Sequence, residues 1–581
     1  MISVNETGFL PYAVKLAVSD KDGSFYIVDD NEGKRLDTGV VAIPAGYDET
    51  AGHDVYRLDF SGVSDPGIYH IESEEGESSA AFKVEPHVYK TLKNSLLKAF
   101  YFRRCGAYLP RRHAGPFERG ICHTEKSRFL GSEEACLLHK GWHDAGDYGR
   151  YVSAGSVAAA HMLYAYELFP EAFREEVNIP ESENEIPDIL NECRYELEFL
   201  SEMQDEDGGV HHKVTPFVFS EFIMPEDETC EQFIFPVTSM ATADFAAVMC
   251  IASRVYAEYD PAFARDCMHQ AYMAGQWLAE HPENTDFHNP EGCNTGEYKD
   301  SSDKDERMWA YAELIRCDHE AGNKNDRSIM AASARRESRH DRYLKLFREA
   351  FAEYVKDHPH SDNRSVDDGF GWQDVSAFAA VAVIFDPMNY AGEELREQMT
   401  GILKERADEF VNMQEEGYPL SMMKQDFVWG SNMVVSNRAG VMLLTGLALR
   451  QKIDQKLESL EEQISALKLD IEVYEEAALN QIHYILGMNA MDRSYVTGFG
   501  DHAVKNPHNR VTVADRVARP IPGEVSGGPC ILLADATIKN CADENTPPQK
   551  CYIDDHMSYS TNEVSIYWNS SLLFAVAYFD R

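Results

Sequence analysis

The residues best suited to acid–base chemistry in this 581-residue chain form the sequence Gly-Trp-His-Asp-Ala-Gly-Asp-Tyr at 141–148. Two aspartates, Asp144 and Asp147, flank two small residues, which permit a tight turn that aims both carboxyl groups at one point. Like charges held close together raise the proton affinity of at least one partner, as a general base requires. The spacing alone is equally typical of a loop whose aspartates cap a helix or contact water.

A second candidate carboxylate, Glu563, lies in the sequence Ser-Tyr-Ser-Thr-Asn-Glu-Val-Ser-Ile-Tyr-Trp-Asn at 558–569. We expect Glu563 to begin an amphipathic helix, where an acidic residue often does no more than stabilise the helix dipole. The aromatic neighbours Tyr559 and Trp568 favour another interpretation, because desolvation would raise the pKa of Glu563 and make it a proton donor.

Cysteines and histidines just before the aspartate motif suggest metal binding. Two thiolates and two imidazoles suit a closed tetrahedral Zn²⁺ site, although the spacing is not that of a zinc finger. The candidate ligands are Cys105, Cys122, His123 and His143. Cys136 and His139 are competing ligands that the sequence leaves open.

An oxygen-rich loop at 295–300, which ends in Asp300, precedes the acidic pair Asp305 and Glu306. Hard oxygen ligands suit Ca²⁺, so we expect a calcium site here. The alternative is a solvated acidic loop that caps the following helix.

The elements that must position these residues fall into two regions. Residues 1–87 contain short β-branched and alternating runs separated by Gly, Asp, Asn and Pro, which predict a small β-sandwich. From residue 89 onward, about twelve segments have the length and apolar content of helices, joined by long loops rich in Asp, Gly, Pro and aromatic residues. The predicted helices are 91–104, 152–168, 186–204, 238–258, 262–280, 305–320, 341–357, 374–385, 393–413, 432–450, 453–486 and 562–579.

The segment 450–477 has apolar residues every three or four positions, from Ile453 to Ile471, which predicts a single amphipathic helix. Two interpretations remain open. The segment packs on the body of the protein as a surface helix, or it is a coiled-coil arm for self-association.

Composition limits the partners. The chain carries 54 Lys and Arg against 98 Asp and Glu, a net charge of −44, which argues against binding nucleic acid or an anionic membrane. It contains no run of about 18 apolar residues, so we expect no transmembrane helix. The first residues lack a basic segment followed by an apolar one, and twelve cysteines read as free thiols, so we expect a cytoplasmic protein.

Taken together, the motifs resemble those of glycoside hydrolase family nine, the endoglucanase and cellodextrinase family. The resemblance runs in order from about residue 90 to residue 581. The opening sequence VNETGFLPYAVKLAV resembles the immunoglobulin-like module that precedes the catalytic domain in one branch of the family. Besides the two carboxylate motifs, the similar segments are 305–314, 429–437, 484–500, 507–510 and 522–529.

This resemblance implies a mainly α protein, with an immunoglobulin-like β-sandwich at 1–87 followed by an (α/α)6-barrel catalytic domain at 88–581. It also implies hydrolysis with inversion, in which a water molecule fits between two carboxyl groups about 6.5–9.5 Å apart. By motif, Asp147 would be the general base, Asp144 would help to hold the water, and Glu563 would be the general acid.

The resemblance assigns substrate and metal ligands as well. His508, Arg510 and Tyr559 would contact the sugar. The branch with the N-terminal module carries a structural zinc that the four Cys and His residues match, and Asp374 would join Asp300, Asp305 and Glu306 around calcium. Tryptophans stack on the apolar faces of glucose, although each could equally belong to the core. The candidates are Trp309, Trp372 and Trp429.

The family implies no organic cofactor. We therefore expect cleavage of β-1,4-glucosidic bonds in cellulose-type glucans or soluble cello-oligosaccharides, with an exo-acting β-glucosidase or exo-β-glucosaminidase as the alternative. Two positions, Asn509 and Cys530, depart from the family pattern, and this weakens the glucan assignment more than the reaction type. A hydrolase with a catalytic zinc and a non-catalytic sugar-binding protein are the competing classes.

Overall fold

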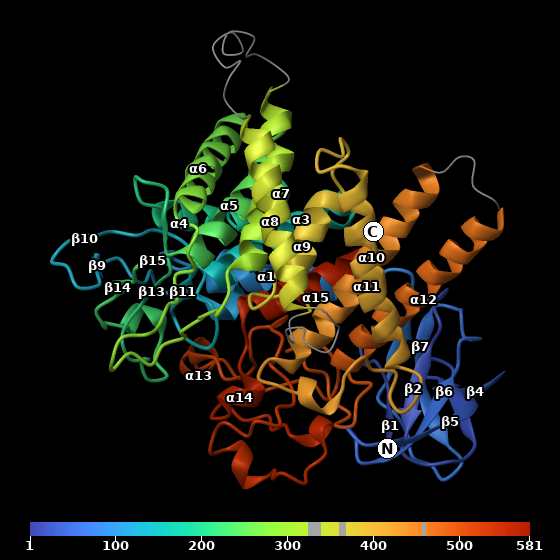
Figure 1. Ribbon diagram of the computed structural model, residues 1–581. Coiled ribbons are helices and arrows are strands. Elements are labelled where there is room, and N and C mark those ends of the chain that lie inside the picture. Colours follow the sequence, from blue (N-terminus) through green and yellow to red (C-terminus); the bar gives the residue numbers. More distant parts are fainter. Residues whose placement is uncertain (323–337, 359–367, 456–460) are drawn as a thin grey trace. The chain divides into compact units, whose positions relative to one another are not determined.

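The computed structural model describes residues 1–322, 338–358, 368–455 and 461–581 (Figure 1). The chain divides into two compact units, which are described separately. Unit 1 comprises residues 1–102, 114–117 and 404–581, and unit 2 comprises residues 103–113 and 118–403.

Unit 1 begins with a β-sandwich of two antiparallel four-stranded sheets, in the orders β1-β2-β6-β5 and β4-β3-β7-β8. Its core is apolar and includes Phe9, Ile27 and Phe82. Three strands, β1, β4 and β5, lie outside the runs that predict the sandwich, because β1 has two residues, half of β4 is charged and β5 is interrupted by Pro44. The strands are β1 (Ile2–Ser3), β2 (Leu16–Ser19), β3 (Phe25–Asp29), β4 (Lys34–Gly39), β5 (Val41–Asp48), β6 (His53–Asp59), β7 (Gly67–Ser73) and β8 (Phe82–Val84).

The sandwich is joined to the C-terminal part of the same unit by polar contacts. Arg57 donates hydrogen bonds to the carbonyl oxygens of Gln414 and Gly417, and the carboxylate of Asp48 accepts one from the backbone of Tyr418. The predicted domain boundary after residue 87 lies in the connection between β8 and the first helix, yet the sandwich belongs to the same compact unit as residues 404–581.

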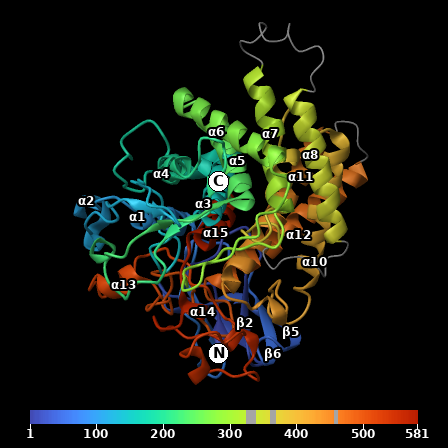
Figure 2. The ribbon, with the colours of Figure 1, turned by 60° about the vertical axis from the view of Figure 1, so that its left-hand side comes forward.

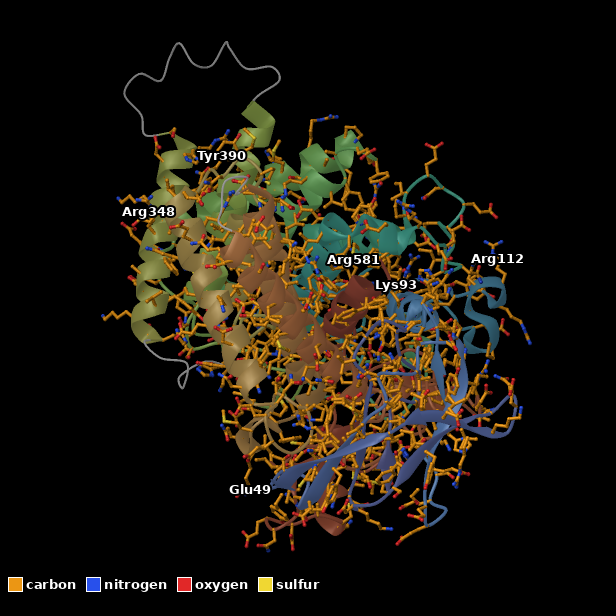
Figure 3. The ribbon with its side chains drawn as sticks, turned by 90° about the vertical axis from the view of Figure 1, so that its right-hand side faces the viewer. Glu49, Lys93, Arg112, Arg348, Tyr390 and Arg581 are labelled. Atoms are coloured by element: carbon orange, nitrogen blue, oxygen red, sulfur yellow. The ribbon has the colours of Figure 1, made fainter. Side chains whose placement is uncertain are left out.

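Among the helices of unit 1, the fully buried α15 contacts both α11 and α12. Lys93 of α1 forms a buried ion pair with Asp580, next to Arg581 at the C-terminus, which fixes α1 beside the end of α15 (Figure 3). The helices are α1 (Lys90–Arg103), α11 (Ser431–Gln455), α12 (Glu461–Ile485), α13 (Arg510–Ala514), α14 (Tyr559–Asn562) and α15 (Ile566–Phe579).

The prediction of one helix over 450–477 is wrong. Helix α11 ends at Gln455, α12 begins at Glu461, and the two helices pack against each other (Figure 1). The apolar positions Leu457 and Leu460 lie outside the described residues. Ile471 is buried within unit 1, which agrees with a helix packed on the body, while self-association stays a prediction.

Unit 2 is built mainly of helices. Figures 1 and 2 show α6 beside α5 and α8 beside α7, and α5 also packs against α3 and α7. The long helices predicted from the sequence are all present, with ends shifted by a few residues at most apart from the 450–477 region. They are α3 (Val152–Leu168), α4 (Asp188–Glu202), α5 (Ser239–Val255), α6 (Pro261–Glu280), α7 (Lys304–Gly322), α8 (Arg339–Asp357) and α9 (Ser376–Ile384), with α10 (Glu393–Asn412) crossing from unit 2 into unit 1.

Short strands in the loops of unit 2 hold the segment that carries the paired aspartates. In one sheet, β11 pairs with β13, and in a second, β12 pairs with β15. The strands are β9 (Ser127–Phe129), β10 (Ala135–Cys136), β11 (Arg150–Tyr151), β12 (Val210–His211), β13 (Lys213–Thr215), β14 (Phe233–Ile234) and β15 (Val237–Thr238). Within the described residues, every helix is too short or too polar to cross a membrane.

Candidate active site and metal centres

Asp144 and Asp147 lie on a tight turn that leads into β11. The backbone N–H of Asp144 donates to the carbonyl of Gly149 at 3.0 Å, which closes the turn, and Arg103 donates to the carbonyl of Ala145 within it. Both aspartates are buried, with 2% and 7% of their surface exposed. The turn therefore holds two carboxyl groups close together in a site with little water.

Each aspartate accepts a hydrogen bond from a tyrosine. Tyr298 donates to Oδ2 of Asp144 at 2.5 Å, and Tyr151 donates to Oδ2 of Asp147 at 3.0 Å. The hydroxyl of Tyr151 in turn accepts a hydrogen bond from the backbone N–H of Gly296 at 3.1 Å. The loop around Gly296 and Tyr298 therefore supports both carboxyl groups, a role that sequence reasoning missed.

Lys213 of β13 holds this loop in place through hydrogen bonds. Its side chain is buried and donates to the carbonyl of Gly296 at 2.6 Å and to the side chain of Asn289 at 2.7 Å. Burial lowers the pKa of Lys213 to about 8. Nothing in the sequence singled out Lys213, because its strand meets the motif only through the pairing of β13 with β11.

The surroundings of Asp144 favour the protonated form of its carboxyl group. Burial, and secondly the charge of Asp147, raise the pKa of Asp144 to about 8, while the hydrogen bond from Tyr298 opposes the rise. Oδ1 of Asp144 is buried and accepts no hydrogen bond. One carboxyl group of the pair thus keeps its proton at neutral pH, as expected for two like charges that share a site.

Glu563 does not begin a helix, which corrects the prediction. It follows α14, has an extended backbone and pairs with His508 in an isolated parallel β-bridge, before α15 begins at Ile566. The helix that follows is also not amphipathic, because every residue of α15 is buried. The half-buried Glu563 is held by backbone hydrogen bonds, including one from Gly527 to its carbonyl at 2.8 Å.

Two of the predicted sugar ligands, His508 and Tyr559, are neighbours of Glu563 in unit 1. Nδ1 of His508 donates to the carbonyl of His556 at 2.6 Å, and burial lowers the pKa of His508 to about 4, so its imidazole is neutral. Arg510 is the first residue of α13. Asn509, which departs from the family pattern, caps that helix by accepting a hydrogen bond from the N–H of Val511.

Two of the predicted stacking residues are accessible to a ligand. Trp429 is 44% exposed, and its ring centroid lies 5.2 Å from that of Tyr559. Trp372 is half-buried and packs edge-to-face on Tyr298 with centroids 4.9 Å apart. The prediction for Trp309 is wrong, because this residue of α7 is fully buried. The alternative of a core residue is correct.

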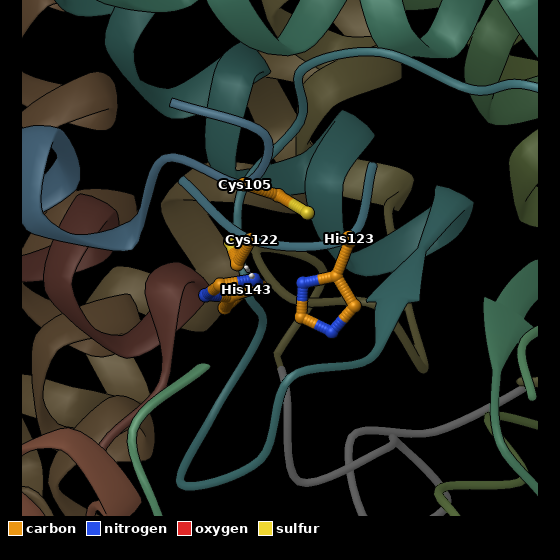
Figure 4. Close-up of side chains that lie close together, drawn as sticks. All are labelled: Cys105, Cys122, His123 and His143. Atoms are coloured by element: carbon orange, nitrogen blue, oxygen red, sulfur yellow. Dashed lines mark hydrogen bonds between the residues drawn. The ribbon is translucent and has the colours of Figure 1, made fainter. Parts of the chain in front are cut away.

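The proposed zinc ligands come together in unit 2. The ligand atoms of Cys105, Cys122, His123 and His143 all lie within 4.8 Å of one another (Figure 4). The competing residue His139 pairs with Glu202 and does not belong to this group, and neither does Cys136.

The chemistry of this group fits zinc. Burial lowers the pKa of His143 to about 4, so its imidazole is neutral. Nε2 of His123 donates to Glu228 at 2.8 Å, while its Nδ1 is buried without a hydrogen bond. Burial opposes ionisation of Cys105, but Cys122 and the charge of Arg150 bring its thiol pKa well below the usual value. Burial opposes protonation of His123, but the neighbouring thiols of Cys105 and Cys122 raise its pKa to about 12, so zinc binding would displace a proton from this imidazole. Two thiol sulfurs and two imidazole nitrogens are the donor atoms that Zn²⁺ prefers.

Of the predicted calcium ligands, Asp305, Glu306 and Asp374 are buried and Asp300 is half-buried, and the four are less tightly grouped than the zinc ligands. Among the described residues, two sets of three or more candidate metal ligands lie within 4.8 Å of one another, and the calcium set is not one of them. Asp305 and Asp374 already accept hydrogen bonds, from the backbone of Val375 and from Tyr354. Both carboxylate oxygens of Glu306, by contrast, are buried without a hydrogen bond, and burial raises its pKa well above the usual value.

An acidic residue that the sequence analysis did not select, Asp244 of α5, lies close enough to Glu306 to influence its ionisation. Asp244 is fully buried, and burial raises its pKa well above the usual value. Its position in an alanine-rich, apolar helix was the only signal in the sequence. Several buried carboxyl groups must therefore share protons or a cation.

Comparisons with known proteins agree with these motifs. Residues 89–576 match the family model described as glycosyl hydrolase family 9, and residues 1–78 match the cellulase N-terminal ig-like domain. A cellodextrinase of Butyrivibrio fibrisolvens is 37% identical over 99% of this chain and 99% of its own length.

Solved structures show the same fold over the whole chain. A thermostable endoglucanase of Alicyclobacillus acidocaldarius has a TM-score of 0.85 and 30% identity, covering 100% of this chain and 99% of its own. AaCel9A in complex with a cellobiose-like isofagomine has a TM-score of 0.83, 30% identity and the same coverage. These matches confirm the predicted fold class, a small β-sandwich followed by an (α/α)6 barrel.

Proposed function

Because the chain belongs to glycosyl hydrolase family 9, we propose that it is an inverting β-1,4-glucan hydrolase that acts mainly on soluble cello-oligosaccharides. The observation that carries the proposal is the turn at Asp144 and Asp147, with two buried carboxyl groups each held by a tyrosine hydroxyl. A turn that only capped a helix would not need both aspartates removed from water, since burying a carboxylate is costly.

The chemistry proceeds in one step with two proton transfers. Asp147 accepts a proton from a water molecule as that water attacks the anomeric carbon, and Asp144 hydrogen-bonds the same water. Glu563 donates its proton to the glycosidic oxygen, which leaves with the departing sugar. The attacking water enters opposite the leaving group, so the product has the inverted configuration.

The sugar ligands proposed with Glu563 are His508, Arg510 and Tyr559. With Nδ1 of His508 bound to a backbone carbonyl, Nε2 is the ring atom left for a sugar hydroxyl. The exposed ring of Trp429, beside Tyr559, offers an apolar face for glucose.

The preference for soluble oligosaccharides rests on the cellodextrinase, which is similar to this chain over nearly its whole length. Endo-acting cleavage of longer glucans is the second candidate, favoured by the endoglucanase that shares the fold. An exo-acting β-glucosidase or exo-β-glucosaminidase is the third, and it would give one monosaccharide per cleavage event.

We propose a structural Zn²⁺ at Cys105, Cys122, His123 and His143. The support is the compact group of two thiol sulfurs and two imidazole nitrogens, which would fill a tetrahedral coordination shell. Since His143 directly precedes Asp144, the metal would stiffen the turn without taking part in the chemistry. A catalytic zinc is less favoured, because four protein ligands occupy the positions that water would need.

We also propose a structural Ca²⁺ at Asp300, Asp305, Glu306 and Asp374. The support is the burial of the carboxyl groups of Asp305, Glu306 and Asp374, and the two oxygens of Glu306 that accept no hydrogen bond. Asp300 lies two residues after Tyr298, so calcium would order the loop that holds Asp144. Removing Ca²⁺ with a chelator should lower both the melting temperature and kcat, and readdition should restore them.

We propose that the protein works in a reducing compartment such as the cytoplasm, because its cysteines are free thiols. All twelve cysteines are free thiols, and most of them are buried. Mass spectrometry of protein isolated from its native cells without reductant should find no disulfide. Finding a native disulfide would contradict this assignment.

The decisive test of function is proton NMR during digestion of cello-oligosaccharides labelled at the reducing end. The proposal expects the α-anomer to appear first and short cello-oligosaccharides to be hydrolysed faster than polymeric cellulose. Initial formation of the β-anomer would contradict inversion. Release of glucose alone would favour the exo-acting alternative, and turnover of glucosamine oligomers would favour the glucosaminidase.

A further inference from the structure

A second group of potential metal ligands lies in unit 1, apart from the cysteines. Glu6 comes from the segment between β1 and β2, while Asp492 and His502 come from the loop that follows α12. Their ligand atoms all lie within 4.8 Å of one another. The group therefore connects the N-terminal sandwich to a loop of the helical part of the same unit.

The loop is shaped closely around Glu6. The backbone N–H of Glu6 donates to the carbonyl of Leu486 at 2.9 Å, and its Oε2 accepts from the backbone N–H of His502 at 2.8 Å. Gly487 and Gly500 have φ of +129° and +100°. A Cβ at Gly500 would lie 2.4 Å from Oε2 of Glu6, so only glycine lets the backbone approach this carboxylate.

Two oxygen atoms in this group have no hydrogen-bond donor. Oε1 of Glu6 and Oδ1 of Asp492 are both buried and accept no hydrogen bond, and the side chain of Glu6 is fully buried. Nδ1 of His502 lies at ion-pair distance from both carboxylates, 3.0 Å from Oε1 of Glu6 and 3.3 Å from Oδ2 of Asp492, although Oε1 of Glu6 accepts no hydrogen bond from it. Buried carboxylate oxygens without donors are costly unless a cation balances them.

These separations fit a shared metal ion. Two ligand atoms that each lie about 2.1 Å from one metal ion are about 3.0 Å apart at octahedral angles and about 3.4 Å apart at tetrahedral angles. The distances from Nδ1 of His502 to the oxygens of Glu6 and Asp492 lie in this range. One imidazole and two carboxylates favour a borderline transition cation such as Zn²⁺ over Ca²⁺, which prefers oxygen alone. The side chain of His502 is 49% exposed, so water can reach the remaining coordination positions.

We propose that Glu6, Asp492 and His502 bind a divalent transition cation, Zn²⁺ in the first instance, which fastens the N-terminal sandwich to the loop at 486–502. The charges around this group are compatible with the binding of a cation. Glu77 and Asp501 add negative charge, while the terminal amine and Arg493 partly offset it. This site is independent of the four Cys and His residues in unit 2 and of the proposed catalytic function.

The test is calorimetric titration of the full-length protein, first saturated with Ca²⁺ and with one equivalent of Zn²⁺ so that any tighter sites are filled. The proposal expects one further equivalent of Zn²⁺ to bind, with release of heat or protons and a rise in melting temperature. Co²⁺ offered in its place should give weak visible bands without a thiolate charge-transfer band, because the proposed ligands contain no sulfur.

Two variants locate the site. Glu6→Gln and His502→Gln should each lose the further equivalent, whereas Asp501→Asn, the same kind of change at the adjacent exposed residue, should keep it. Glu6→Gln retains an oxygen for the backbone of His502, so it should stay folded, as circular dichroism would verify. If the wild-type protein binds no further Zn²⁺ at about 100 µM, or if both variants bind it as the wild type does, the proposal is wrong.

Discussion

The hydroxyl of Tyr298 lies 2.5 Å from Oδ2 of Asp144 and donates a hydrogen bond to it. The two residues are 154 positions apart in the chain. Tyr298 belongs to the same short loop as Asp300, a proposed calcium ligand, and as Gly296, which supports Asp147 through Tyr151. The loop at 295–300 thus connects a proposed metal site to both paired aspartates.

Replacing Tyr298 by Phe should lower kcat by about 10- to 100-fold with little change in KM, because the hydrogen bond positions a catalytic group and does not bind the sugar. Steady-state kinetics on cellotetraose would measure it. Since the bond opposes the raised pKa of Asp144, its loss should also raise that pKa further. Tyr108→Phe, at an exposed tyrosine of the same unit, is the matched control and should leave kcat unchanged.

The raised pKa of Asp144 has a consequence for stability. Its pKa is about 8 in the folded protein against an ordinary value of 3.8. Between those values the unfolded chain releases a proton that the folded protein keeps, so the free energy of unfolding falls as pH rises from about 4 to about 8. Asp144→Asn removes this effect.

The Asp144→Asn variant should therefore be more stable than the wild type at pH 7.5, by about 1–3 kcal/mol, with a smaller difference at pH 4.5. Urea unfolding at the two pH values would measure it. Hydrolysis should fall by at least about 100-fold in the same variant. A stability difference that is equal at both pH values would contradict the assigned pKa.

Glu563→Gln should reduce hydrolysis by about 1,000-fold or more while cello-oligosaccharide binding persists, because the amide keeps the shape of the side chain but cannot donate the required proton. Kinetics and isothermal titration with cellotetraose give the two quantities. Substrates with a good leaving group, such as dinitrophenyl cellobioside, should lose much less activity. Nearly intact turnover of cellotetraose would show that Glu563 is not the acid.

Cys122→Ser, or removal of zinc by a strong chelator, should lower the melting temperature by several degrees and leave most of the activity at low temperature, because the metal stiffens the loop and does not touch the substrate. Metal analysis and calorimetry would follow the loss. Cys230→Ser, at an exposed cysteine outside the group, is the control. Immediate and complete loss of activity at a temperature where the fold persists would favour a catalytic zinc instead.

Trp429→Ala should raise KM for longer cello-oligosaccharides by about 2- to 10-fold, the value of one stacking contact, with a smaller effect on short aryl glucosides. Trp309→Phe tests the opposite case. Since Trp309 is buried in the core and its Nε1 donates to Tyr164, the change should lower stability and leave KM unchanged. An increase in KM for Trp309→Phe would contradict its placement in the core.

Much of the local structure could be predicted because it depends on residues that are neighbours in the chain. Helix α3 has the predicted bounds, since its alanine-rich segment has high helix propensity and its burial agrees with its apolar composition. The strands β4 and β5 were missed for the converse reason: charges in one and Pro44 in the other obscure the alternation, and pairing with β3 and β6 outweighs that local pattern.

The sequence by itself determined the reaction class, because Asp144 and Asp147 must share a turn and because several family motifs occur in order. It also named four Cys and His residues that the fold brings together. Only the tertiary structure decided which groups support the aspartates, since Tyr151 and Tyr298 donate to them from a strand and a separate loop, and Lys213 holds that loop. The sequence favoured Trp429 over Trp309 as a stacking residue, because Trp429 lies in a loop motif and Trp309 in a predicted helix. Only the packing shows that Trp309 is a core residue and that Trp429 is exposed.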